Sequence, residues 1–328
     1  MRIILIFCVL IISSCQSETS FEFSTYWWKS STKLNTQQKE FLNTNNINKI
    51  YLRIFDLKFD EKNSSILIPK VYSGFNDINT IPVIYIENKI FSNFNIDTIY
   101  NLIQQNIKSA IDKKIINSTN NLQIDCDWTL TTKEPYFQLL KALSKGIKGL
   151  SATIRLHQIK YAQATGIPPV EKGIVMIYNL ESPAEVNIKN SIFSYDKAMQ
   201  YLDGYLDKYP LKIAIALPAF SWGVHYHHGK IKSLMSDFNP EKIDNMNMSK
   251  NKDGYYKSKK AHFYNTHRIS NRDEIRYEYP KIEELNKMMT FLLHNIKQDS
   301  TEIIFFSLNS NFLTNNKINY EKIISTYK

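Results

Sequence analysis

Apolar residues along this chain follow two alternating patterns, and each has the period of one kind of secondary structure. Short runs rich in isoleucine, valine, phenylalanine and tyrosine have the length and composition of buried β-strands. Eight such runs lie at residues 23–28, 49–55, 81–86, 122–128, 149–157, 174–179, 212–220 and 302–308. Residues 96–114, 135–143, 195–208 and 281–297 instead place apolar side chains three or four positions apart, as helices with one buried face require.

Strands that alternate with helices favour parallel pairing through right-handed crossovers. Eight strand–helix units within residues 23–328 predict a single (β/α)8 barrel of the TIM type, a fold that typically needs ~250 residues and more with insertions. An open, doubly wound sheet is the alternative. It ranks second because no glycine-rich phosphate loop follows the first predicted strand.

Residues 223–280 are too many for an ordinary connection and predict a long insertion after strand seven. The insertion follows a strand on the face where barrel enzymes carry their active sites. Its tyrosines and histidines suit a hairpin flap over that face. Its middle part, residues 244–260, is rich in asparagine and lysine and favours an irregular surface excursion.

The N-terminus has the features of an export signal. Arg2 precedes an apolar stretch at residues 3–12, and small residues follow. Ile12-Ser13-Ser14-Cys15 resembles the lipobox of bacterial lipoproteins, in which the cysteine is acylated and becomes the first mature residue. This resemblance implies a signal peptide at residues 1–14, lipidation of Cys15, a tether within residues 15–22, and attachment to a bacterial membrane of the cell envelope. An ordinary signal peptide that contains a cysteine is the alternative.

The composition excludes several protein classes. With 43% hydrophobic and 22% charged residues among 328, the chain can bury a large core and is not a mainly disordered protein. A mean hydropathy of −0.34, with no long apolar run, excludes a polytopic membrane protein. Two of three cysteines lie in the first fifteen residues, which leaves Cys126 alone and excludes a disulfide framework or a cysteine-based zinc site. No cofactor is predicted.

The formal charge of +10 suits a partner with phosphates or anionic sugars, or an anionic lipid surface. The lysines are scattered along the chain, apart from a cluster at residues 250–260, as a solvated surface would have them. No recognisable nucleic-acid-binding module is present, so no nucleic-acid partner is predicted. The pattern does not indicate an oligomeric state.

Two carboxylates stand at the end of the fourth predicted strand. Gln123, Asp125 and Asp127 share one face of this strand and should point into the barrel. Like charges this close disfavour double ionisation, so one carboxyl should have a raised pKa unless a cation lies nearby. Arg155 and His157, on one face of the next predicted strand, could supply that cation. A buried network that only closes the barrel is the structural alternative.

At this point the chain resembles the chitinase-like glycoside hydrolases of family 18. Asp125-Cys126-Asp127-Trp128 is similar to that family's Asp-x-Asp-x-Glu core, and Met176-Ile177-Tyr178-Asn179 is similar to its Met-x-Tyr-Asp element. The resemblance implies a barrel that acts on a polysaccharide. It also implies that Asp127 orients the substrate's N-acetyl group, that Asp125 supports Asp127, and that Tyr178 donates a hydrogen bond to that group.

The chain also departs from this family. Thr129 occupies the position of the catalytic glutamate, Asn179 replaces an aspartate, and the family's Ser-x-Gly-Gly element is absent from residues 81–88. A replacement acid could be Glu87, Glu171 or Glu181, although each also fits an ordinary surface carboxylate. The sequence therefore leaves three interpretations open: a glycoside-hydrolase-like enzyme, a catalytically silent carbohydrate-binding barrel, and a structural envelope lipoprotein.

Tryptophans lie where two predicted strands end. Trp27 and Trp28 must face opposite sides of the first strand, and Trp222 follows the seventh. Aromatic faces beside a few polar groups suit sugar binding. We therefore take these three residues, with Glu87, Arg155, His157 and Asn179, as candidate substrate-binding residues. Core packing is the alternative for each tryptophan.

Three histidines in the segment His225-Tyr226-His227-His228 could ligate a metal ion. No carboxylate stands at a matching spacing, so a solvent-facing cluster is the preferred interpretation and no metal site is predicted. The chain also has no serine nucleophile elbow and no Walker loop, and acyl transfer and nucleotide hydrolysis therefore have no support.

Overall fold

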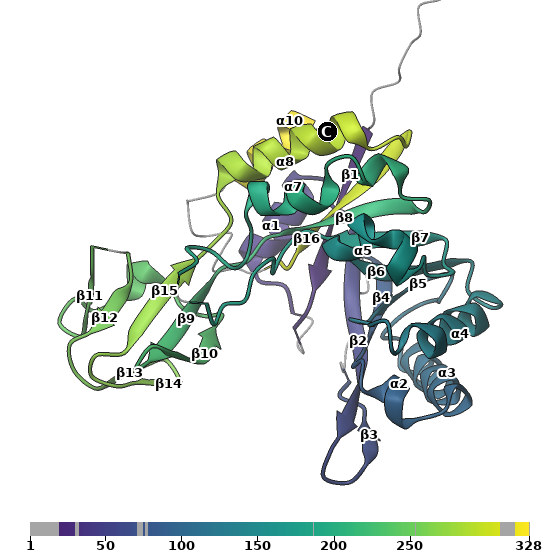
Figure 1. The fold of residues 1–328 in the computed structure, drawn as a ribbon, viewed down its shortest axis with the longest axis horizontal. Coiled ribbons are helices and arrows are strands. Elements are labelled where there is room, and N and C mark those ends of the chain that lie inside the picture. The colour runs from purple at the N-terminus through teal and green to yellow at the C-terminus, as the bar shows by residue number, and fades with distance from the viewer. Residues whose placement is uncertain are drawn as a thin grey trace, which may run out of the picture.

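Eight parallel strands close into a barrel in the computed structural model (Figure 1), which describes residues 20–29, 33–70, 75, 78–185, 187–252, 254–308 and 319–327. The barrel strands are β1 (Ser20–Trp27), β2 (Lys49–Asp60), β4 (Asn79–Ile86), β5 (Asn121–Asp125), β6 (Gly149–Arg155), β7 (Lys172–Met176), β8 (Lys212–Pro218) and β16 (Ser300–Phe306). They pair in the order β1-β16-β8-β7-β6-β5-β4-β2, and β1 also pairs with β2. The predicted (β/α)8 barrel is confirmed.

Helices connect the strands and surround the barrel (Figure 1). They are α1 (Thr36–Thr44), α2 (Ile90–Asn93), α3 (Ile96–Asp112), α4 (Lys133–Ser144), α5 (Leu156–Lys160), α6 (Ala162–Thr165), α7 (Tyr195–Leu202), η1 (Leu206–Lys208), α8 (Ile282–Asn295) and α10 (Tyr320–Tyr327). In α3 the side chain of Asn95 caps the first turn, and Ile99, Ile103 and Ile107 form the buried stripe. The apolar spacing in the sequence therefore predicted both the helix and its inner face.

All eight predicted strands are present, but several end earlier than expected. β5 ends at Asp125, so Asp127 lies in the following loop. β7 ends at Met176, so Tyr178 and Asn179 also follow the strand. The prediction that Arg155 and His157 share one strand is wrong, because β6 ends at Arg155 and His157 belongs to α5. These candidate residues therefore lie in the loops and short helix at the C-terminal ends of the strands, the end we call the mouth.

The insertion after β8, the seventh barrel strand, forms a five-stranded antiparallel sheet in the order β10-β9-β15-β12-β11 and a separate two-stranded sheet, β13-β14, beside the barrel (Figure 1). Its elements are β9 (Trp222–His227), β10 (Lys230–Met235), η2 (Pro240–Lys242), β11 (Met248–Lys250), β12 (Tyr256–Ser258), β13 (His262–Tyr264), β14 (His267–Ile269) and β15 (Glu274–Glu278). Met235, Phe238 and Ile275 belong to a small core of its own. The expectation of irregular structure at residues 244–260 is wrong for the two short strands β11 and β12, which pair there.

A buried carboxylate ties the insertion to the barrel. Glu278 is 1% exposed and accepts hydrogen bonds from Trp222 Nε1 at 2.8 Å and from the Ser191 backbone N–H at 3.0 Å. Arg276 Nε lies 2.6 Å from the same carboxylate, and Arg276 Nη2 donates to the Pro183 carbonyl at 3.1 Å. Ser191 and Pro183 belong to the segment after β7, so this network joins one side of the mouth to the insertion sheet.

The opposite end of the barrel is closed by a different ionic cluster. Glu302 on β16 contacts Lys172 Nζ at 2.9 Å and Lys49 Nζ at 3.2 Å, and it accepts a 2.8 Å hydrogen bond from Tyr51. Burial alone raises the pKa of Glu302, but the two lysines outweigh burial and hold this pKa below its ordinary value. The cluster therefore keeps a charged carboxylate inside the end of the barrel that faces away from the mouth.

The N-terminal residues predicted to form the signal peptide, with Cys15, lie outside the described residues. Residues 20–22, which were expected to belong to the tether, are instead part of β1. Across the described ranges, no helix combines the length and the apolar character that are needed to cross a membrane.

Candidate functional site at the barrel mouth

The side chains of β5 alternate between the barrel axis and the helices, as predicted. Gln123 accepts a 2.7 Å hydrogen bond from Tyr26 and donates one of 3.1 Å to Thr153. Thr153 in turn donates a 2.6 Å hydrogen bond to Asp125 Oδ1. Trp128 points to the other side and packs against Phe137 of α4, with ring centroids 5.1 Å apart. A chain of hydrogen bonds therefore leads from β1 through the barrel interior to the carboxyl of Asp125.

The environment of Asp125 favours its protonated form. Burial raises the pKa of Asp125 to about 7, the hydrogen bond from Thr153 opposes this shift, and the negative charge of Asp127 adds to it. Like-charge repulsion, which the sequence suggested as the cause, is therefore smaller than desolvation. At neutral pH the protonated and ionised forms of this carboxyl are therefore both populated.

A second buried carboxylate, Asp56, was not predicted from the sequence. The strand register aligns Asp56 of β2 with Tyr85 of β4, and Tyr85 with Asp125 of β5, so the three side chains share one face of the sheet. Asp56 is 1% exposed and lies 3.3 Å from both Arg53 Nε and Lys58 Nζ. Burial, Asp125 and Asp127 raise the pKa of Tyr85 to about 12. Asp56 thus contacts two cationic side chains, whereas no cation of the described residues forms an ion pair with Asp125 beyond Tyr85.

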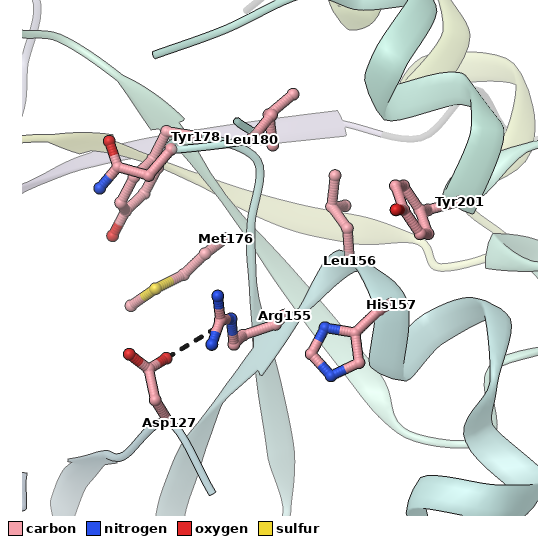
Figure 2. Close-up of a pocket in the computed structure, with 9 residues that line it drawn as sticks. Asp127, Arg155, Leu156, His157, Met176, Tyr178, Leu180 and Tyr201 are labelled. Carbon is pink, nitrogen blue, oxygen red and sulfur yellow. Dashed lines mark ion pairs between the residues drawn. The ribbon is translucent and has the colours of Figure 1, made fainter. Parts of the chain in front are cut away.

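Asp127 differs from Asp125 in its exposure. Its side chain is 57% exposed, and Oδ1 lies 3.6 Å from Arg155 Nε (Figure 2). The predicted cation beside the acid pair is therefore present, and it contacts Asp127. His157 lies nearby on α5. Burial lowers the pKa of His157, the charge of Arg155 lowers it further, and Asp127 opposes the shift.

A cavity of about 280 Å³ opens beside these residues (Figure 2). Its walls come from the loop after β5, the start of α5, the segment after β7 and one residue of α7. The lining residues are Asp127, Arg155, Leu156, His157, Met176, Tyr178, Asn179, Leu180 and Tyr201. We call this the mouth cavity. It brings together five candidates that the sequence analysis named, whereas Met176 and Tyr201 were not among them.

Tyr178 connects the mouth cavity to an aromatic cluster. Its ring stacks on Phe306 with centroids 4.7 Å apart and planes at 15°. Its hydroxyl is buried and has no hydrogen-bond partner among the described residues. Burial raises the pKa of Tyr178 well above its ordinary value, so the hydroxyl keeps its proton and can donate. Leaving such a group unpaired costs ~1–3 kcal/mol. The neighbouring Asn179 has φ 53°, a left-handed conformation that asparagine tolerates.

Phe306, at the end of β16, is the centre of that cluster and was missed in the sequence analysis. Its ring centroid lies 5.5 Å from that of Trp28 and 5.9 Å from that of Phe220. Phe220 contacts Trp222 at 5.2 Å, and Arg53 covers the ring of Trp28 at 5.2 Å. Trp28 and Trp222 are partly exposed. The candidates Trp28 and Trp222 therefore belong to one aromatic surface at the mouth.

Two candidates do not belong to the site. Trp27 is 1% exposed and packs edge to face on Phe75, so it is a core residue and not a sugar-stacking one. Glu87 does not line the mouth cavity, and its Oε2 accepts a 3.0 Å hydrogen bond from the Phe59 backbone. It supports β2 where the strand continues into its hairpin with β3 (Ser65–Leu67).

The position expected for a general acid carries hydroxyl groups instead. Thr129 Oγ1 lies 2.9 Å from Thr131 Oγ1 and 3.2 Å from Thr132 Oγ1. Thr132 donates a 2.6 Å hydrogen bond to Asn88 Oδ1. The two other possible replacement acids are also engaged or distant. Glu181 pairs with Lys197 at 3.3 Å, and Glu171 lines a pocket at the opposite end of the barrel.

The histidines of β9 bind a carboxylate within the insertion. His225 Nε2 lies 2.7 Å from Asp273 Oδ2, and His227 Nδ1 lies 2.6 Å from Oδ1 of the same residue. The expected solvent-facing cluster is wrong for His225, which is 1% exposed. Within the described ranges, no group of three or more histidine, cysteine, aspartate or glutamate side chains could hold a metal ion.

Comparison with solved structures finds barrels of the same fold, chitinases among them. The chain aligns with the Bacillus cereus spore cortex-lytic enzyme SleL at 14% identity and a TM-score of 0.58, covering 94% of this chain and 75% of that one. It aligns with the C-terminal domain of a putative chitinase from Desulfitobacterium hafniense at 10% identity and a TM-score of 0.55, covering 94% and 98%. It aligns with a family 18 chitinase from Cycas revoluta at 13% identity and a TM-score of 0.51, covering 93% of this chain and 98% of that one.

At these identities the likeness establishes the fold class, a TIM-type barrel, and leaves the chemistry to the residues of the site. No protein-family model matches the sequence, and no curated protein matches it. The structure of the Cycas chitinase was solved with a tetramer of N-acetylglucosamine. The structural neighbours therefore share the barrel fold that the resemblance implied.

Proposed function

We propose that this protein recognises a polysaccharide at the mouth of its barrel. The observation that carries the proposal is the mouth cavity itself, in which an exposed carboxylate, Asp127, lies beside an aromatic surface and Tyr178, whose hydroxyl has no hydrogen-bond partner among the described residues. Sugars present hydroxyl and amide groups to such polar side chains and an apolar ring face to aromatic ones. The chitinase-like neighbours support the same substrate class.

Recognition without cleavage is the function that the site supports best. Most glycosidases place two carboxyl groups on opposite sides of the scissile bond. Among the residues that line the mouth cavity, Asp127 is the single carboxylate, and Asp125 lies buried two residues before it. Thr129 has a hydroxyl where the acid would be, and a hydroxyl does not protonate a leaving group at neutral pH as a carboxyl of raised pKa does.

Glycoside hydrolysis is the second candidate, and one observation favours it. The pKa of Asp125 is about 7, which is the range that a proton carrier needs at neutral pH. A hydrolytic function would require Asp127 and Asp125 to share this proton next to a bound sugar. It would also require water to reach the bond from the side of Tyr178.

Calorimetry with reducing-end assays on the purified protein would test both candidates. We expect N-acetylated oligosaccharides or peptidoglycan fragments to bind saturably without the release of reducing ends. Asp127→Asn should weaken binding about tenfold, the loss of a hydrogen bond to a charged group. Asp112→Asn, at the exposed end of α3, is the matched control and should bind normally. Release of reducing ends would favour hydrolysis.

Absence of any glycan binding would support the third interpretation, a structural envelope protein. In that case Asp127→Ala would change only the melting temperature.

We further propose that the protein is exported and held on a bacterial membrane of the cell envelope by a lipid on Cys15. The support for this is the lipobox-like sequence alone, because Cys15 lies outside the described residues. Two or more acyl chains anchor a protein stably, whereas a single chain gives only marginal binding. An anchored polysaccharide-binding protein would keep its glycan close to the membrane.

A further inference from the structure

We infer that the mouth cavity is built for an acidic sugar, whose carboxylate binds to Arg155 beside His157. This inference deepens the proposed glycan recognition and rests on it. The contact between Arg155 and Asp127 uses Nε at 3.6 Å, which is an ion-pair distance but too long for a hydrogen bond. Neither the Arg155 side chain nor the ring of His157 donates a hydrogen bond within the described part of the chain.

The free groups of Arg155 have the geometry that a carboxylate needs. A guanidinium presents parallel N–H groups that bind both oxygens of a carboxylate at once. Its side chain is 49% exposed, so a ligand in the mouth cavity can reach it. A neutral sugar has no charged group that can pair with these parallel N–H groups. Arg155 therefore distinguishes an acidic sugar from a neutral one.

A further positive charge contacts one of the residues that line the cavity. Lys160 Nζ of α5 lies 5.8 Å from the ring centroid of Tyr201, which lines the cavity from α7. Asp127 lies beside Arg155, so the cavity holds a cation and a carboxylate next to each other. Asp127 can accept hydrogen bonds from hydroxyl or amide groups of a ligand. A sugar whose carboxylate lies close to N–H or O–H donors matches this pair.

The size and the net charge of the protein agree with this ligand. A volume of about 280 Å³ is at the lower end of the ~300–1,000 Å³ of ligand sites and suits one unit of a longer glycan. The formal charge of +10 attracts a polyanionic chain over longer distances, and this attraction weakens as salt rises. An acidic polysaccharide therefore fits both the cavity and the protein as a whole.

The test compares two probes that differ in one group. The first is the disaccharide of N-acetylglucosamine and N-acetylmuramic acid, and the second is the same disaccharide with its carboxyl reduced to an alcohol. By calorimetry we expect the purified protein to bind the acid at least about tenfold more tightly. Arg155→Gln should remove this preference, so that the variant binds the acid and the reduced sugar with equal affinity. Arg155→Lys, which keeps the charge and loses the fork, should keep part of it.

Matched variants make the outcomes distinct. Arg268→Gln, on β14 in the insertion, should keep the full preference, and His157→Gln should reduce it. Equal binding of both probes by the unaltered protein would overturn this inference and leave glycan recognition intact. A preference that persists in both Arg155→Gln and His157→Gln would also overturn it. If neither probe nor any N-acetylated glycan binds, the proposed function fails as well.

Discussion

The ring of Tyr178 lies flat against the ring of Phe306, at a centroid distance of 4.7 Å. One residue follows β7 and the other ends β16, so the contact passes over the end of β8, which lies between these two strands. The stack fixes the plane of Tyr178 and thereby the direction of its hydroxyl, which has no hydrogen-bond partner among the described residues. It also joins the mouth cavity to the surface formed by Trp28 and Phe220.

Phe306→Ala should weaken glycan binding about tenfold, because aromatic contacts are worth ~0.5–1.5 kcal/mol beyond burial and Tyr178 would lose its support. The free energy of unfolding of the variant should also fall by about 2 kcal/mol, which is less than the loss when a fully buried phenylalanine is replaced by alanine. Calorimetry and chemical denaturation measure the two effects. Phe263→Ala, whose side chain is 70% exposed in the insertion, is the control and should change neither. Unchanged binding in Phe306→Ala would remove the aromatic cluster from the site.

The buried carboxyl of Asp125 should lower the free energy of unfolding as pH rises from about 4 to about 7. Burial raises the pKa of Asp125 to about 7, so the folded state holds a proton that the unfolded state releases at lower pH. The stability that this proton provides is complete below pH 4 and is lost as pH passes 7. Three units of pKa correspond to up to about 4 kcal/mol.

Asp125→Asn removes this dependence and keeps the acceptor for Thr153. Between pH 4 and pH 8 the melting temperature of the variant should therefore rise relative to that of the unaltered protein as pH rises. Asp112→Asn, which alters an exposed carboxylate, should follow the profile of the unaltered protein. Parallel profiles for Asp125→Asn and the unaltered protein would show that this carboxyl is ionised throughout the range.

Glu278→Ala should destabilise the protein by about 3–5 kcal/mol, because it leaves the buried charge of Arg276 without its partner and removes the acceptor for Trp222. Chemical denaturation measures the loss, and limited proteolysis should cut first between the barrel and the insertion. Glu274, on the same strand as Glu278, forms an exposed ion pair with Lys257 of β12, and Glu274→Ala should cost less than about 1 kcal/mol. Equal losses in the two variants would mean that Glu278 does not tie the insertion to the barrel.

Cys15→Ser should release the protein from the membrane. Serine cannot form the thioether that lipidation requires, so incorporation of labelled acyl chains should stop and the protein should leave the membrane fraction. Cys126→Ser alters the buried cysteine on the far side of β5 and is the control for the loss of a thiol as such. Membrane fractionation that survives in Cys15→Ser would refute the proposed anchor.

The sequence predicted the barrel well because each strand carries its own apolar run. It also predicted which side of β5 faces the axis, since Gln123 and Asp125 alternate with apolar neighbours. The ends of the strands were predicted less accurately. Arg155-Leu156-His157 alternates as a strand would, yet α5 begins at Leu156, because so short a segment fits both periods.

The aromatic part of the site could not be predicted, for a physical reason. Residues 303–306 are apolar on both faces of β16, so no alternation shows that Phe306 turns toward the mouth and Phe305 toward the core. Asp56 was missed because it is a single acidic residue in a largely apolar strand. Its partners Arg53 and Lys58 contact it only once β2 has formed.

Ser20 starts β1 at the base of the barrel, beside the cluster around Glu302, and five peptide steps separate it from Cys15. A fully extended chain of this length reaches roughly 17 Å. If Cys15 carries the proposed lipid, the base must sit almost on the bilayer, and the opening with Asp127 and Arg155 must look outward. A molecule in this orientation would bind glycan chains on the side away from the membrane and would have little access to the lipids beneath it.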